Sequence, residues 1–168
     1  MRRLAVVVVT VLSLGAAAFA EGADRKAYVA ILDFQILSSE KELSVLAAEV
    51  PQALSAAFLK GRYLKPVERQ ELEKALREME LGSSDAVDSR TAQQIGRLLG
   101  AKYLLLGSLT KLAATAKISY RLVRTETGEI VQADSVRGKF DDLFDLEDLL
   151  VRKVEEFLAK SAADLSAR

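Results

Sequence analysis

The residues best suited to bind a metal ion lie in one acidic segment, DDLFDLED, at positions 141–148. Carboxylate oxygens are the ligands that calcium and magnesium prefer, but the segment lacks the glycine-containing loop spacing of an EF-hand. Acidic residues also gather at the start of helices, where they suit the helix dipole and cap free N–H groups. We therefore predict a helix start and no metal site for the acids of this segment, which are Asp141, Asp142, Asp145, Glu147 and Asp148.

Nucleophilic catalysis would need an activating base, and the chain contains neither His nor Cys. Their absence removes the commonest general base and the usual ligands of zinc, copper and iron. A Ser-Lys pair remains, with Ser108 and Lys111 as candidates, but their side chains would diverge near the end of one predicted strand. No base is evident for Ser38, Ser39 or Tyr120, and no phosphate-binding glycine motif occurs. The sequence predicts no enzyme and no cofactor.

Asp33 ends an apolar run and is a further candidate for ligand binding. Open α/β sheets often bind ligands where their strands end. The alternative is that Asp33 forms a hydrogen bond with a nearby loop or pairs with a base such as Arg69, and we favour this structural role.

The first twenty residues, MRRLAVVVVTVLSLGAAAFA, have the plan of a secretory signal peptide: two Arg, an apolar run, and small residues before the cleavage site. We expect cleavage between Ala20 and Glu21. A retained membrane anchor is the competing interpretation, although the run barely reaches the length that spans a bilayer.

Residues 21–168 then form a single domain, which carries 22 basic and 24 acidic residues and a net charge of −2. Nothing in this balance favours binding to nucleic acid, because no basic stripe is present. The lack of Cys excludes disulfides, so packing must hold the fold. It also excludes lipidation through an N-terminal cysteine.

The first half of the chain alternates strands and helices. The apolar run 26–34 predicts a buried strand, and an apolar stripe over 43–58 predicts a helix that Pro51 kinks or divides and that ends at Gly61. The segment 62–67 carries Pro66 and suits an edge strand. A helix is predicted over 68–82, ending at Gly82.

A short helix follows, with Thr91 and Gln94 at capping-box spacing and Gly100 at its end. The apolar run 101–109 predicts an interior strand beside the first one. From Lys117 onward, Ile118, Tyr120 and Leu122 alternate with Lys117, Ser119 and Arg121, which predicts an antiparallel hairpin with one buried and one exposed face.

That hairpin turns at 125–128, where Gly128 supplies positive φ, and its return strand runs from 129 to 136. A final amphipathic helix ends the chain. The order β-α-β-α-α-β-β-β-α predicts one α/β domain with a mixed sheet and two or three layers.

Several stretches in order, VAILDF, YLKPVERQELEKALREMEL, TAQQIGRLLGAKYLLLGSL and ISYRLVRTETGEIV, resemble the CsgG-like family. This family includes the curli secretion channel, the flagellar outer-membrane protein FlgO and activators of penicillin-binding proteins. The resemblance covers residues 27–160 and implies a domain like the N-terminal domain of TolB, which acts at the bacterial envelope by binding proteins. Members are commonly lipoproteins anchored by a Cys after the signal peptide, where this chain has Glu21.

We expect a non-catalytic, periplasmic protein-binding module that assists assembly or secretion, with other envelope proteins or further copies of itself as partners. The alternative is a self-associating structural subunit of a secretion complex associated with the outer membrane. In the curli channel of this family, insertions that enter the membrane follow two of the corresponding strands. Here only residues 111–117 lie at the first of these positions, which is too few for a membrane-spanning hairpin, and the segment 137–148 at the second is too acidic to face lipid. We expect no pore-forming hairpins and no direct membrane insertion.

Overall fold

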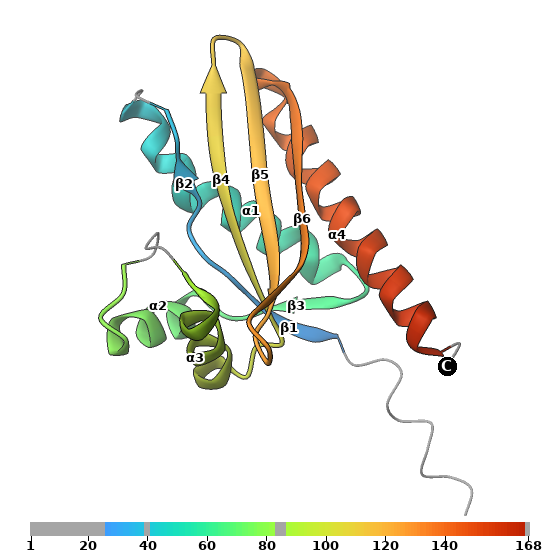
Figure 1. Cartoon of the computed structure of the whole chain (residues 1–168). Helices are drawn as coiled ribbons and strands as arrows, with labels where there is room; N and C mark the ends of the chain where they lie inside the picture. The colour runs from blue at the N-terminus through green and yellow to red at the C-terminus, as the bar shows by residue number, and fades with distance from the viewer. Residues whose placement is uncertain (1–25, 39–40, 83–86, 167–168) are drawn as a thin grey trace, which may run out of the picture.

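The computed structural model describes residues 26–38, 41–82 and 87–166, which form a six-stranded mixed sheet with helices on both faces (Figure 1). The elements are β1 (Ala27–Ile31), β2 (Gln35–Ile36), the 3₁₀ helix η1 (Lys41–Val45), α1 (Leu46–Lys60), β3 (Leu64–Pro66), α2 (Arg69–Glu78), α3 (Ser89–Leu99), β4 (Tyr103–Leu112), β5 (Thr115–Arg124), β6 (Glu129–Lys139), the 3₁₀ helix η2 (Phe140–Asp142) and α4 (Leu143–Ser166).

The strand order is β3-β1-β4-β5-β6, and β2 pairs with β4 off this path. β1 runs parallel to both β3 and β4, whereas β4, β5 and β6 are antiparallel to their neighbours. The predicted mixed sheet is confirmed, with β3 at one edge and β1 beside β4 in the interior. The two 3₁₀ helices and β2 were not predicted.

β1 and β2 form one interrupted strand along β4. Ile31 pairs with Leu105 and Gln35 pairs with Ser108, so four steps along one strand match three along the other. One extra residue therefore lies between the two pairs, as in a β-bulge. The interruption places Asp33 off the regular ladder.

Pro51 lies within α1 and does not divide it. Proline has no N–H, so the carbonyl of Ala47, four residues earlier, lacks its helical donor. The Phe34 amide, released from the interrupted strand, donates to this carbonyl instead (2.8 Å), and the Pro51 carbonyl accepts from Ser55 Oγ (2.8 Å). The amide left unpaired by the strand interruption therefore bonds the carbonyl left unpaired by the proline in the helix.

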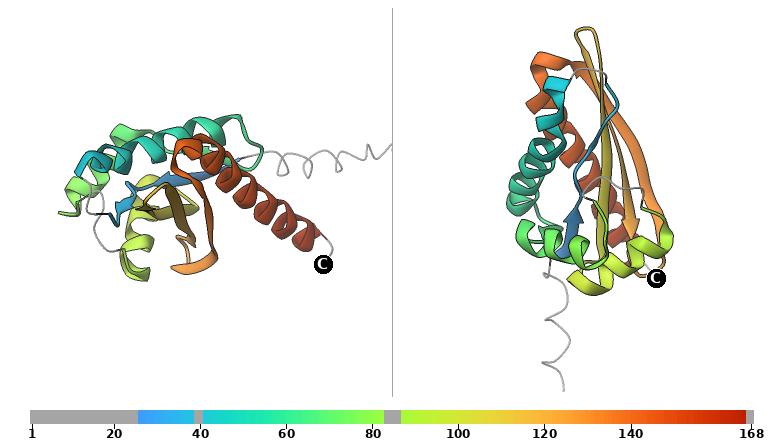
Figure 2. Two further views of the ribbon diagram at one scale, coloured as in Figure 1. Left: turned by 90° about the horizontal axis from the view of Figure 1, so that it is seen from above. Right: turned by 90° about the vertical axis from the view of Figure 1, so that its left-hand side faces the viewer.

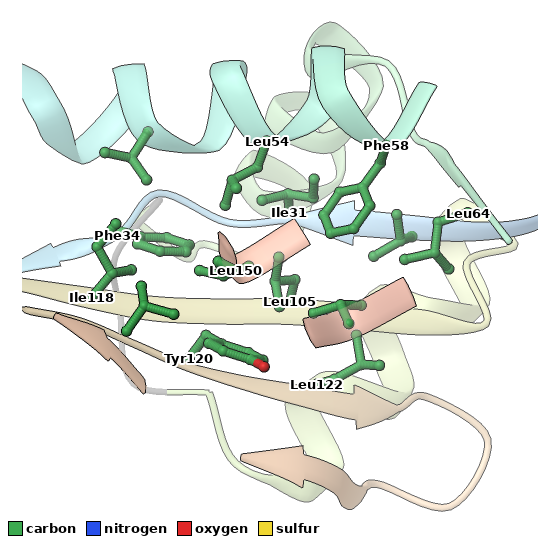
Figure 3. Close-up of a cluster of buried hydrophobic side chains, with 14 of the residues drawn as sticks. Ile31, Phe34, Leu54, Phe58, Leu64, Leu105, Ile118, Tyr120, Leu122 and Leu150 are labelled. Carbon is green, nitrogen blue, oxygen red and sulfur yellow. The ribbon is translucent and has the colours of Figure 1, made fainter. Parts of the chain in front are cut away.

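Two hydrophobic clusters hold the sheet between its helices. The larger one lies between the sheet and the helices α1 and α4, and it includes Phe34, Phe58 and Leu150, all fully buried (Figure 3). The smaller one lies on the opposite face beneath α2 and α3, and it includes Leu104 and Ile95. Because α2 and α3 cover only one end of their face, the domain has three layers at that end and two at the other (Figures 1 and 2).

The helix ends differ from the predictions in detail. Asp88 caps α3, with its carboxylate accepting from the Thr91 amide (2.7 Å), so the predicted capping role of Thr91 is wrong. α2 ends at Glu78 rather than Gly82, and Glu80 takes the left-handed conformation (φ 55°). Gly61 caps α1 as predicted, but with extended backbone.

The two hairpins of the antiparallel part have short turns. β4 and β5 pair from Tyr103 to Arg124 and are joined through Ala113 and Ala114. The second turn has Gly128 at φ 73°, as predicted, but β6 continues to Lys139, beyond the predicted end.

Candidate binding face

The half of the sheet that α2 and α3 leave uncovered is the main candidate site. Side chains alternate between faces along a strand, so every second residue of β4, β5 and β6 points to this side. We call this surface the open face, and its residues are Leu106, Ser108, Thr110, Lys117, Ser119, Arg121, Ala133, Ser135 and Arg137.

A hollow of about 530 Å³ lies over the open face. Leu32, Asp33 and Gln35, from β2 and the segment before it, form one wall. The floor consists of strand residues, many of them with small side chains. The hollow exists because, among the described residues, no helix packs over this part of the open face and because many of the floor side chains are small.

Three serines form a row across the floor. Ser108 lies opposite Ser119, and Ser119 lies opposite Ser135. Adjacent strands are about 4.8 Å apart, so the row offers hydroxyl groups at that spacing, each able to donate and accept a hydrogen bond. We call Ser108, Ser119 and Ser135 the serine row.

Cationic side chains flank the serine row. Lys117 lies directly opposite Arg137 on one side of it, and both are exposed. On the other side lies Arg121, which is partly buried and donates to the Val87 carbonyl (3.2 Å). The open face therefore carries positive charge on both sides of the serine row.

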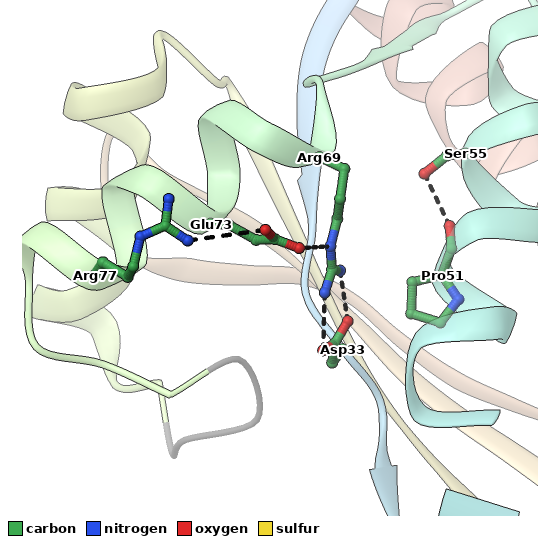
Figure 4. Close-up of polar contacts among 6 residues, drawn as sticks. All are labelled: Asp33, Pro51, Ser55, Arg69, Glu73 and Arg77. Carbon is green, nitrogen blue, oxygen red and sulfur yellow. Dashed lines mark hydrogen bonds and ion pairs between the residues drawn. The ribbon is translucent and has the colours of Figure 1, made fainter. Parts of the chain in front are cut away.

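Asp33 pairs with Arg69, as the sequence predicted. The guanidinium forms two bonds to the carboxylate, of 2.5 and 3.0 Å, and Arg69 Nε donates to Glu73 (2.8 Å) (Figure 4). Hydrogen bonding to Asp33, despite partial desolvation, raises the pKa of Arg69. The arrangement fixes the start of α2 against the interruption of the strand, and both Asp33 oxygens are engaged within the protein.

The candidate nucleophiles do not form a catalytic arrangement. Ser38 Oγ donates to the Lys111 carbonyl (3.0 Å) and accepts from the Lys111 amide (2.8 Å), so it extends the pairing of β2. The Lys111 ammonium lies 4.6 Å from the centre of the Phe140 ring, on the face opposite to Ser108. The predicted divergence of Ser108 and Lys111 is confirmed.

Tyr120 faces the core, where burial raises the pKa of its hydroxyl to about 12. Its oxygen accepts from Gln132 Nε2 (3.1 Å). Ser39 lies outside the described residues, as do Ala20 and Glu21, the residues of the expected cleavage site.

The acidic segment lies in η2 and the first turns of α4, where it was predicted. In the part of the chain that the structure describes, no three carboxylates converge to hold a metal ion. Glu147 is the buried member, and desolvation, followed by the charges of Asp148 and Glu49, raises its pKa to about 7.

The sequence indicated half of the open face. Alternation from Lys117 predicted that Lys117, Ser119 and Arg121 share an exposed face, as they do. It did not place Ser135 and Arg137 beside them, because that requires the register between β5 and β6. The bulge at Leu122/Val123 shifts this register.

A family model described as curli production assembly/transport component CsgG matches residues 16–117, more than half of the chain. The chain belongs to the CsgG family. No match was found among curated proteins.

Solved structures with the same fold include members of the groups that the resemblance implied. The C-terminal domain of LpoB from Escherichia coli superposes with a TM-score of 0.56 at 23% identity, covering 71% of this chain and 87% of that one. Lipoprotein GNA1162 from Neisseria meningitidis superposes with a TM-score of 0.52 at 19% identity, covering 76% of this chain and 96% of that one. TolB from Acinetobacter baumannii gives 0.54 at 7% identity, covering 80% of this chain and 29% of TolB. These similarities confirm the predicted TolB-like fold.

Within the described residues, no helix is both long enough and apolar enough to span a membrane.

Proposed function

We propose that this chain is a non-catalytic, exported protein-binding module that assists assembly or secretion at the bacterial cell envelope. The observation that carries the proposal is the open face, a hollowed surface of hydroxyl and cationic side chains on the side of the sheet opposite the larger hydrophobic cluster. Membership of a family whose model is named for curli assembly and transport supports the envelope setting.

Site-specific cross-linking tests the use of this face. A photoreactive amino acid at Ser119, at the centre of the serine row, should trap one or a few envelope proteins in intact cells. The same group at Glu156, exposed on α4, is the matched control. Cross-linked products of equal yield from both positions, or no cross-linked product from Ser119, would contradict the proposal.

Short connections support the part of the proposal that excludes pore-forming hairpins. Ala113 and Ala114 alone join β4 to β5, and β6 leads directly into η2. A membrane-spanning hairpin needs about 20 residues with its turn. Conductance steps from the purified protein in planar bilayers would overturn this part.

A second candidate, a self-associating structural subunit, is favoured by β6. This strand of 11 residues is the last in the sheet order, and Ile130 on it is 55% exposed. Exposed edge strands are templates for pairing with another chain. Light scattering of the purified mature protein separates the candidates, because a ring or stack gives a multiple of the monomer mass.

A further inference from the structure

Lys117 and Arg137 form a pair of like charges. They lie directly opposite each other on β5 and β6, an arrangement that destabilises a sheet. Neither forms an ion pair with a carboxylate of residues 26–38, 41–82 or 87–166. By contrast, Arg124 on β5 forms an ion pair with Glu129 on β6 at 3.8 Å.

Acids near the open face are already neutralised by other cations. Both oxygens of Asp33 are bound by Arg69. Asp134 accepts from Lys153 of α4 (2.5 Å) and from the Ser135 amide, and these contacts lower its pKa. The positive charge of the open face therefore has no internal counterpart among these neighbours.

The shape of the face favours an extended ligand. Lys117, Ser119 and Arg121 alternate along β5, which places the two cations roughly 13 Å apart with a hydroxyl between them. Ser108 and Ser135 extend the hydroxyl groups across the neighbouring strands. The floor of the hollow spans β4, β5 and β6 and is several side chains wide, which suits an extended peptide better than a compact molecule.

We propose that an acidic, extended segment of a partner protein binds to the open face. Its carboxylates lie against Lys117, Arg137 and Arg121, and its backbone polar groups form hydrogen bonds with the serine row. This deepens the proposed protein-binding function and rests on it. The like-charge pair persists because the bound segment offsets its repulsion, an exchange of stability for function that proteins commonly show.

Fluorescence anisotropy with the chain 21–168 tests the proposal. The probe is a labelled decapeptide of alternating Glu and Ala, and the neutral match alternates Gln and Ala. We expect the acidic peptide to bind at least tenfold more tightly than the neutral one, with affinity falling as salt rises. Equal binding of the two peptides would overturn the proposal.

Charge reversal locates the binding. Lys117→Glu with Arg137→Glu should weaken binding of the acidic peptide at least tenfold. The control, Arg152→Glu with Lys160→Glu on exposed positions of α4, makes the same change in net charge and should leave binding within twofold. An equal loss in both variants would show unspecific attraction and would overturn the proposal.

Vesicles containing phosphatidylglycerol form the last arm. Binding to vesicles but not to the acidic peptide would assign the cations to phosphate groups and refute the inference. A Ser119 cross-link to an envelope protein, without affinity for the acidic peptide, would refute the partner chemistry alone. The absence of a cross-link with peptide binding intact would instead count against the proposed function.

Discussion

At the scale of single residues, Lys117 shows how a surface charge lowers stability when its cross-strand partner has the same sign. It faces Arg137 directly. Because opposite charges at such positions stabilise a sheet, Lys117→Glu should raise the free energy of unfolding by about 0.2–1 kcal/mol. Urea denaturation measures the change, and Lys160→Glu is the control. A lower midpoint for Lys117→Glu would mean that the two cations do not repel each other.

Glu147 gives the fold a pH dependence. Its pKa is raised from 4.5 in the unfolded chain to about 7 in the folded protein, chiefly by burial. The folded state therefore holds a proton that unfolding releases between these values, so the free energy of unfolding falls as pH rises through this window.

The variant Glu147→Gln keeps a similar shape without the ionisable group. We expect it to be more stable than the wild type at pH 8, on the order of 1–3 kcal/mol, with the difference vanishing near pH 4.5. Thermal denaturation across pH measures this, and Glu156→Gln, exposed on the same helix, should retain the wild-type profile. A constant difference at all pH values would exclude titration of Glu147.

The hydrogen-bond partner of a residue could be predicted from the sequence only where both residues lay at recognisable ends of strands or helices. The pairing of Asp33 with Arg69 was predictable, since a strand end and a helix start placed both groups. The partner of Ala47 was not, because the donor Phe34 comes from a strand interruption that leaves no trace in hydropathy. Asp88 was missed because Thr91 offered a competing cap.

At the scale of elements, α3 packs on the β5–β6 hairpin through a glycine. Gly96 is buried, and a Cβ there would lie 2.2 Å from the Cβ of Thr125, whose hydroxyl donates to the Ala101 carbonyl (2.5 Å). Glycine thus permits the close approach of helix and hairpin.

We expect Gly96→Ala to lower the free energy of unfolding by about 1–3 kcal/mol through overpacking. In a helix without this contact, the same change would raise stability by up to about 1 kcal/mol. The sign of the shift in the urea midpoint decides between the two, with Gln94→Ala on the exposed side of α3 as the control. A gain in stability would show that α3 is not held against Thr125.

The strands differed in how readily their sequences revealed them. Continuous apolar runs identified β1 and β4 as interior strands, and Leu104 is indeed fully buried. β2 was invisible, since two residues carry no periodicity and only pairing with Ser108 and Leu109 defines them. The open face depends on register and on the absence of a covering helix, neither of which a single strand encodes.

At the scale of the whole molecule, we propose export with removal of residues 1–20. The apolar run and the small residues before Glu21 motivate this. Mass spectrometry of protein from the periplasmic fraction should give a chain that begins at Glu21. Intact Met1 in a membrane fraction would support a retained anchor instead.

The order in which the strands pair during folding can be predicted from β4, which has an antiparallel neighbour close in sequence, β5, and a parallel neighbour distant in sequence, β1. Pairing with β5 closes a loop of two residues, whereas pairing Ala30 with Leu104 of β4 closes one of about 70. The longer closure costs on the order of 3 kcal/mol more in chain entropy. We expect pulsed hydrogen exchange to protect the amides of β4 and β5 before those of β1, and simultaneous protection would contradict this. The C-terminal meander would then be the template on which the N-terminal half of the sheet assembles.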